Sequence, residues 1–265
     1  MTKYKMPIRP QDSNKGTFGK VLNFAGSKNY IGAAYLSTLG ILKVGAGYAA
    51  LSSSKGIINS VSKLLPEAVF LSHSDGVNTI KSYDVCLIGC GLGTSIHAKR
   101  LFKNVIQNVN CPIVIDADGL NIQAKLNLPL PENSVITPHP AEAARLLGIG
   151  LNEVLNNLEN SAKKLSEKYN CVTVLKTHRT IICDKDNLFI NEHGNSALAK
   201  AGTGDVLAGI IAGLLAQKCS PLEAAKLGVY LHSRAGEIAS EELTEYSVLA
   251  SDITKYIPQA IKEIL

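Results

Sequence analysis

The chain has 265 residues, of which 46% are hydrophobic, 18% charged and only 5% aromatic, with no Trp. This composition describes a globular protein with an aliphatic core, for which we expect one domain, residues 1–265. The formal net charge of +5 comes from scattered Lys and Arg rather than a basic block, which argues against nucleic acid and favours a small anionic ligand.

Short apolar runs alternate with segments of helical periodicity, which is typical of an α/β fold with a mostly parallel sheet and helices on both faces. The β-branched residues after position 170 instead predict antiparallel strands. The elements expected in chain order are strand 20–26, helix 30–45, strand 48–54, strand 84–93 ending in a glycine turn, helix 97–109, strand 112–121 ending in acids, a short strand and a helix opened by Pro140 within 134–148, one amphipathic helix 151–168, antiparallel strands within 171–191, and helices 203–217, 221–240 and 250–264.

The six cysteines include no Cys-x-x-Cys pair and lie mostly in apolar runs, so we expect them to be reduced and buried. The N-terminal segment lacks the apolar core of a signal peptide, and no stretch reaches the ~18 to 20 apolar residues of a membrane helix. These features predict a cytoplasmic protein that does not contact membranes. No His, Cys and Asp cluster has ligand spacing, so no metal site made of protein ligands alone is expected.

Polar and glycine-rich segments follow the carboxyl ends of four predicted strands. These are AGS at 25–27, GCGLG at 89–93, DAD at 116–118 and TPHP at 137–140. In an open α/β sheet, ligands bind at this edge. The sequence therefore predicts that these four segments surround a common site.

The GCGLG turn follows a strand, as the glycine fingerprint of dinucleotide-binding folds does. That fingerprint fails here, because Thr94 stands at its third glycine position. A P-loop is also excluded, since no Gly-Lys-Ser/Thr follows any glycine run. What remains is either a turn whose backbone a ligand approaches closely or a plain tight turn.

Asp116 and Asp118 are either turn formers or carboxylates for a hydrated Mg²⁺ on phosphates. In TPHPAE, Thr137 near the cap and Glu142 in the first turn suit an ordinary helix start. His139 lies between two prolines at a strand end. It is either structural or a ligand contact.

The segment AGTGD, residues 201–205, is the most specific signal in the sequence. Gly202 and Gly204 can turn the chain so that successive N–H groups point outward at a helix N-terminus, where anions bind. Phosphoryl transfer needs such donors together with a base for the attacking hydroxyl. We therefore prefer an active site, with Asp205 as its base, over a simple helix cap.

With these motifs in order, the sequence resembles the ribokinase-like ADP- or ATP-dependent NAD(P)H-hydrate dehydratases, the carbohydrate-kinase-like domain of the YjeF proteins. The resemblance covers about 240 residues, from KGTFGKVLNFAGSKNYIGAA through IGCGLG, VIDADGLN, ITPHPAEAARLLG and LKTHRTIICD to LHSRAG and LASDI. It implies repair of hydrated NADH or NADPH. The ring hydroxyl of the S epimer is phosphorylated, phosphate is eliminated, and the double bond returns.

The resemblance also implies roles for residues that match the family's motifs. Asp205 would be the base, and the N–H groups of residues 201–204, Thr203 included, would form the anion hole. The positions that match substrate contacts are Ala33, Gly91, Gly93, His139 and Asp205, and those that match contacts to the nucleotide donor are Lys176, Thr177, His178, Arg179, Thr180 and Gly204. Asn195 would help to close the site.

The implied cofactors are ADP or ATP as phosphoryl donor, with Mg²⁺ on the phosphates. The implied assembly is a homo-oligomer, a tetramer by the family's habit, with a separate epimerase acting upstream. The sequence departs from the family's usual motifs at two places. In the loop LKTHRT, Thr177 and His178 stand where a glycine and a small residue are common, and Cys90 stands where proline is common.

Two other functions fit parts of the sequence. AGTGD by itself fits a small-molecule kinase of the same fold, acting on a hydroxymethylpyrimidine or hydroxyethylthiazole type of alcohol. A nucleotide sensor with a lapsed active site is a third hypothesis, against which the intact Asp205 argues.

Overall fold

The computed structural model describes residues 4–185 and 187–265 and contains one nine-stranded sheet. The strand order is β3-β2-β1-β4-β5-β6-β7-β8-β9, in which all neighbours from β3 to β7 are parallel and β7, β8 and β9 are antiparallel. The strands are β1 (Lys20–Phe24), β2 (Tyr48–Ser52), β3 (Val69–Leu71), β4 (Val85–Ile88), β5 (Ile113–Ile115), β6 (Val135–Ile136), β7 (Val172–Leu175), β8 (Ile181–Asp184) and β9 (Asn187–Ile190).

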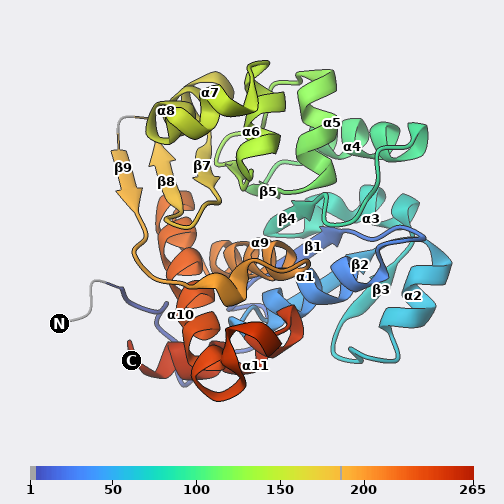
Figure 1. Ribbon diagram of the computed structural model, residues 1–265. Coiled ribbons are helices and arrows are strands. Elements are labelled where there is room, and N and C mark those ends of the chain that lie inside the picture. The colour runs from blue at the N-terminus through green and yellow to red at the C-terminus, as the bar shows by residue number, and fades with distance from the viewer. Residues whose placement is uncertain (1–3, 186) are drawn as a thin grey trace.

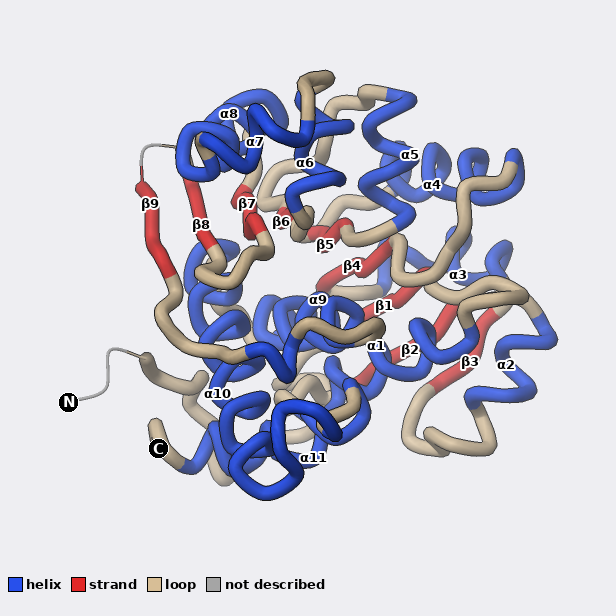
Figure 2. The backbone as a smooth tube through the Cα atoms, in the orientation of Figure 1, coloured by secondary structure: helices blue, strands red, loops and turns tan. Residues whose placement is uncertain are grey.

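Two groups of helices cover the two faces of the sheet, which forms a continuous band between them (Figures 1 and 2). The first group contains α1 (Ile31–Lys43), α2 (Lys55–Val61), α9 (Thr203–Ala216), α10 (Pro221–Ser247) and α11 (Ala250–Lys262). The second contains α3 (His73–Thr79), α4 (Ile96–Asn108), α5 (Asp118–Leu126), α6 (Pro140–Leu147), α7 (Leu151–Asn156) and α8 (Leu158–Tyr169). The predicted mostly parallel sheet with helices on both faces is therefore confirmed.

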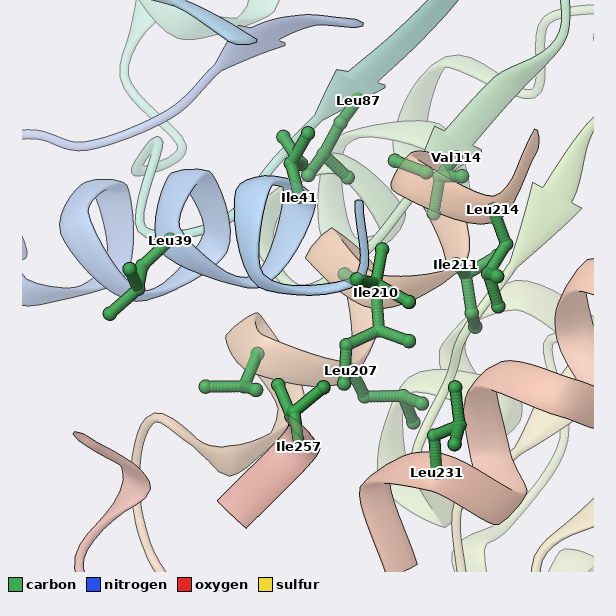
Figure 3. Close-up of a cluster of buried hydrophobic side chains, with 14 of the residues drawn as sticks. Leu39, Ile41, Leu87, Val114, Leu207, Ile210, Ile211, Leu214, Leu231 and Ile257 are labelled. Atoms are coloured by element: carbon green, nitrogen blue, oxygen red, sulfur yellow. The ribbon is translucent and has the colours of Figure 1, made fainter. Parts of the chain in front are cut away.

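Helix α9 lies at the centre of the first layer, where aliphatic side chains surround it on every side (Figure 3). From Val206 to Ala216 all of its residues are buried. It packs closely on α1, because a Cβ at Gly209 would lie only 2.2 Å from the Ser37 carbonyl oxygen. Close packing around a helix this deeply buried holds the backbone at its N-terminus in a fixed position.

One sequence prediction is wrong, because the single helix 151–168 is two helices. Asn157 leaves the helical region with φ −149° and ψ 61°. Thr137, expected near the cap of the helix opened by Pro140, lies two residues before His139, which is the N-cap residue of α6. Strand β3 and helices α2 and α3 received no prediction, since each is only three or seven residues long and too short to show a clear period.

The order of the strands reverses between β1 and β4, which both lie in the middle of the sheet. Chain connections leave these two neighbours in opposite directions, so their carboxyl ends frame a crevice of the kind that binds ligands. The Gly26 amide donates to the Cys90 carbonyl oxygen across this crevice at 2.9 Å, and this bond joins the two glycine-rich loops. No helix among the described residues is long and apolar enough to span a membrane.

Candidate active site

The N-terminus of α9 faces the crevice and carries free backbone donors. Gly202 is its N-cap residue, with a φ of 95° that favours glycine. The Thr203 hydroxyl donates to the carbonyl oxygens of Leu198 at 2.8 Å and Lys200 at 2.9 Å, which fixes the turn. The amides of Gly204 and Asp205 donate to no acceptor among the described residues. Aligned free amides at the positive end of a helix dipole form an anion-binding site.

Asp116 and Lys176 form a buried ion pair beside this helix end. The Lys176 Nζ atom lies 2.6 Å from Asp116 Oδ1, and the Thr137 hydroxyl donates to the same oxygen at 2.7 Å. A Cβ placed on Gly204 would lie 3.4 Å from Lys176 Nζ, so the ammonium group stands directly over the start of α9. The residues after β5 and β6 and at the end of β7 thus present a fixed positive charge next to the free amides.

Asp205, Asp116 and Cys90 bring three potential ligand atoms within 4.8 Å of one another. The Cys90 Sγ atom lies 3.9 Å from Asp116 Oδ2, the oxygen that Lys176 and Thr137 leave free. The sequence spacing gave no indication of this cluster, because its members come from three different loops. The two carboxylates suit Mg²⁺ held mainly by phosphates, whereas a thiol is a poor ligand for that ion.

The carboxyl group of Asp205 is tuned toward neutral pH. Burial raises its pKa to about 7, and the nearby charge of Asp116 adds to the effect, while Cys90 and Lys176 oppose it. A base whose pKa lies near the working pH combines ionisation with basicity, as general-base catalysis requires. The geometry and the pKa both support Asp205 as a proton acceptor.

Glu142 is a second buried carboxyl group near the crevice. Burial raises its pKa to about 7, with Lys176 acting in the opposite direction. Burial lowers the pKa of Lys176, but the carboxylates of Asp116 and Glu142 outweigh it and the net pKa is raised. Lys176 therefore stays charged, with two acids around it.

Two cavities meet at the start of α9. The Lys176 cavity, of about 590 Å³, is lined by Thr203 and Gly204 together with the loop after β7. The Tyr30 cavity, of about 470 Å³, is lined by Ala201, Gly202 and Asp205 together with the start of α1. Neighbouring residues of one turn thus face two different spaces, which is the arrangement that transfer of a group between two ligands requires.

The structure distributes the predicted site residues between these cavities. Those that line the Tyr30 cavity are Ala33, Gly91 and Asp205, and those that line the Lys176 cavity are Lys176, Thr177, His178, Thr180, Gly204 and also His139 and Asn195. His139, matched to the substrate, therefore lies on the side of the residues matched to the nucleotide. Its ring nitrogen caps α6 by accepting from the Ala141 amide at 3.2 Å.

Two predicted residues line neither cavity. Arg179 lies outside both linings, although its neighbours Thr177 and Thr180 belong to the Lys176 cavity. Gly93 donates its amide to Asp118 Oδ2 at 2.8 Å. Asp118, which the sequence offered as a turn former or a magnesium ligand, therefore accepts a hydrogen bond from the glycine turn. Asp118 also lines the Tyr30 cavity.

Sequence reasoning missed the site's supporting residues. Cys90, Thr137 and Glu142 act through contacts that join separate loops. His193 and His232, which line the Lys176 cavity, were not singled out either. The available signal was the position of Thr137 directly after a strand end and that of Glu142 in the first turn of the next helix; nothing local marked the two histidines.

A family model described as NAD(P)H-hydrate dehydratase matches residues 21–259. The ADP-dependent (S)-NAD(P)H-hydrate dehydratase of Bacillus subtilis is 34% identical over 263 residues, which cover 97% of this chain and 94% of that protein. Bifunctional NAD(P)H-hydrate repair enzymes of Thermofilum pendens and Coxiella burnetii are 33% and 37% identical over 98% and 95% of this chain. The chain spans only 53% and 52% of their length.

Solved structures agree with these sequence matches. The crystal structure of the ADP/ATP-dependent NAD(P)H-hydrate dehydratase from Bacillus subtilis, co-crystallised with ATP/Mg²⁺, has a TM-score of 0.90 and 33% identity, covering 98% of this chain and 95% of that one. A hydroxyethylthiazole kinase from Pyrococcus horikoshii shares the fold, with a TM-score of 0.65 at 15% identity over 92% of this chain and 89% of that one. The chain therefore has a ribokinase-like fold and belongs to the NAD(P)H-hydrate dehydratase family.

Proposed function

We propose that this chain dehydrates (S)-NADHX and (S)-NADPHX to NADH and NADPH, with ADP or ATP as phosphoryl donor. The observation that carries the proposal is the single turn, residues 201–205, that presents free amides and a base of raised pKa between two cavities. Relatives about one third identical, which carry this activity in their names, support it.

In the proposed reaction the nucleotide occupies the Lys176 cavity and the hydrated nicotinamide ring occupies the Tyr30 cavity. Asp205 takes the proton of the ring hydroxyl, whose oxygen attacks the terminal phosphorus while the bond to the leaving nucleotide breaks. The amides of Gly204 and Asp205 and the Lys176 ammonium stabilise the negative charge that develops on the transferred group. The bond between the ring carbon and the phosphorylated oxygen then breaks and phosphate leaves with that oxygen, while the adjacent ring carbon loses a proton to water and the ring double bond is restored.

The residues present fit Mg²⁺. Asp116 Oδ2, which only the weak donor Cys90 Sγ contacts among the described side chains, and the carboxylate of Asp205 are oxygen donors of the type this ion prefers when phosphates supply most of its ligands. A bound Mg²⁺ would supply charge neutralisation on the phosphates. Lys176 and Thr137 hold Asp116 Oδ1, so that Oδ2 is the oxygen that faces Cys90 and the site.

Other properties are proposed with the function. Residues 1–265 form one domain, since every described strand belongs to one sheet. The enzyme works in the cytoplasm as a homo-oligomer, a tetramer by family resemblance, which light scattering on the pure protein tests directly. Epimerisation of the R form is supplied by a separate activity, in keeping with the bifunctional repair enzymes among its relatives.

The experiment that tests the function is incubation of the pure protein with (S)-NADPHX and either ADP or ATP. Recovery of the absorbance of reduced nicotinamide, together with release of phosphate, supports the proposal and identifies the donor. Phosphorylation of free hydroxyethylthiazole or hydroxymethylpyrimidine, without recovery from the hydrate, would instead establish the kinase alternative.

A further inference from the structure

A third cavity lies on the other side of the glycine turn from the Tyr30 cavity. This Arg100 cavity, of about 630 Å³, is lined by the loop after β1, by α3 and by the first three turns of α4. Consecutive residues separate the two spaces, since Ser27 and Lys28 line the Arg100 cavity and Asn29 and Tyr30 line its neighbour. The two cavities therefore adjoin along one short stretch of chain.

The glycine turn divides in the same way. Gly91 faces the Tyr30 cavity and Leu92 faces the Arg100 cavity. Beside them, the nearest atom to a Cβ built on Gly93 would be the Ser27 hydroxyl oxygen, at 3.7 Å. Gly91, Gly93 and Ser27 thus leave room for an extended ligand to cross the turn here.

The Arg100 cavity is positively charged and has an apolar part. Two of its lining residues, Lys28 and Arg100, carry a positive charge, and its lining contains no acid. Neither Lys28 nor Arg100 forms an ion pair with any residue that the structure describes. Guanidinium and ammonium groups without a protein partner favour phosphate.

Two further features suit an adenosine group. Val77, Leu92 and Leu101 give the cavity an apolar surface, against which a base can pack. The Nδ1 atom of His73 is buried and has no hydrogen-bond partner. A buried nitrogen without a partner costs free energy that a polar ligand atom would recover.

We propose that the Arg100 cavity binds the adenosine-phosphate half of the dinucleotide substrate, with Lys28 and Arg100 contacting its phosphates. This inference rests on the proposed function. The hydrated ring must reach Asp205 in the Tyr30 cavity, and the Lys176 cavity is filled by the phosphoryl donor in the same turnover. The other half of the substrate must therefore leave across the glycine turn, and the adjoining space carries the charge that phosphates require.

The test measures binding of 2′-phospho-ADP-ribose by calorimetry while saturating ADP fills the Lys176 cavity. We expect Arg100→Ala to weaken binding of the probe at least about tenfold, because the variant loses a hydrogen bond to a charged phosphate. The matched control is Lys103→Ala, an exposed position on the same helix that lies outside the cavity lining. Equal binding by the Arg100 variant and the wild type would overturn the proposal.

Kinetics separate this proposal from the function on which it rests. With (S)-NADPHX, Arg100→Ala should raise KM about tenfold and leave kcat within twofold. The probe should also compete with the product NADPH. Probe binding that does not compete would overturn the proposal in favour of an independent nucleotide site. Absence of dehydration by the wild type would refute the proposed function, while the calorimetric result would stand by itself.

Discussion

Replacement of Asp205 by Asn tests the base directly, because it removes the charge and changes the shape of the side chain very little. Loss of a general base lowers rates by roughly 10²–10⁴-fold, so we expect kcat for dehydration to fall by that factor. The amides at the start of α9 and the Asp116–Lys176 ion pair do not depend on the Asp205 carboxylate. Binding of ADP should therefore stay within a few-fold of the wild type.

The same change should stabilise the protein at alkaline pH. A pKa of about 7 against an ordinary 3.8 corresponds to about 4 kcal/mol of unfavourable ionisation, which solvent screening of this partly exposed group reduces to about 2 kcal/mol. Since the pKa is raised on folding, the wild type loses stability as pH rises from about 4 through 7. The variant avoids this loss and should melt about 4 °C higher at pH 8.

The assay is thermal unfolding of both proteins from pH 5 to pH 8, alongside turnover. Asp252→Asn is the matched control. Its hydrogen bond with Lys255 lowers the pKa of Asp252, and it accepts from the Leu249 amide at the start of α11, so this variant should be less stable at pH 8 and fully active. An Asp205 variant with turnover within a few-fold of the wild type would refute the base. If the difference in Tm between the Asp205 variant and the wild type does not grow with pH, the electrostatic argument is refuted.

Three further predictions follow from the same geometry. Because Asp205 must be ionised and burial raises its pKa to about 7, kcat/KM should fall about tenfold per pH unit below 6 and level off above 8, which a pH profile measures. Lys176→Met should destabilise the protein by about 3 kcal/mol in urea unfolding, because it leaves Asp116 without its cation. Adding Asp116→Asn should restore most of the lost stability, and a double variant no more stable than Lys176→Met would contradict the ion pair. Gly89→Ala should lower the free energy of unfolding by more than about 3 kcal/mol, because its methyl group would lie 2.0 Å from the Asp116 carbonyl oxygen. Gly148 also has a positive φ but no atom within 4 Å of its Cβ position, so Gly148→Ala should lower that free energy by only about 1–2 kcal/mol. Equal losses in urea unfolding would show that backbone conformation alone decides.

Much of the fold could be read from local pattern. Apolar runs and glycine turns predicted the parallel sheet, and Pro140 marked the start of a helix, because these signals act within a few residues. Short elements such as β3 and α3 were missed, since three to seven residues hold no clear period. The break at Asn157 was also invisible, because the pattern on both sides of it is helical.

The sequence by itself determined that residues 201–205 form a glycine turn with an acid at the start of a buried helix, and that other polar segments share one edge of the sheet. Only the tertiary structure decided what these segments do to one another. It placed Lys176 on Asp116, brought Cys90 within reach of both acids, and raised the pKa of Asp205 through burial. Such effects depend on distances between atoms far apart in the chain, so no local pattern records them.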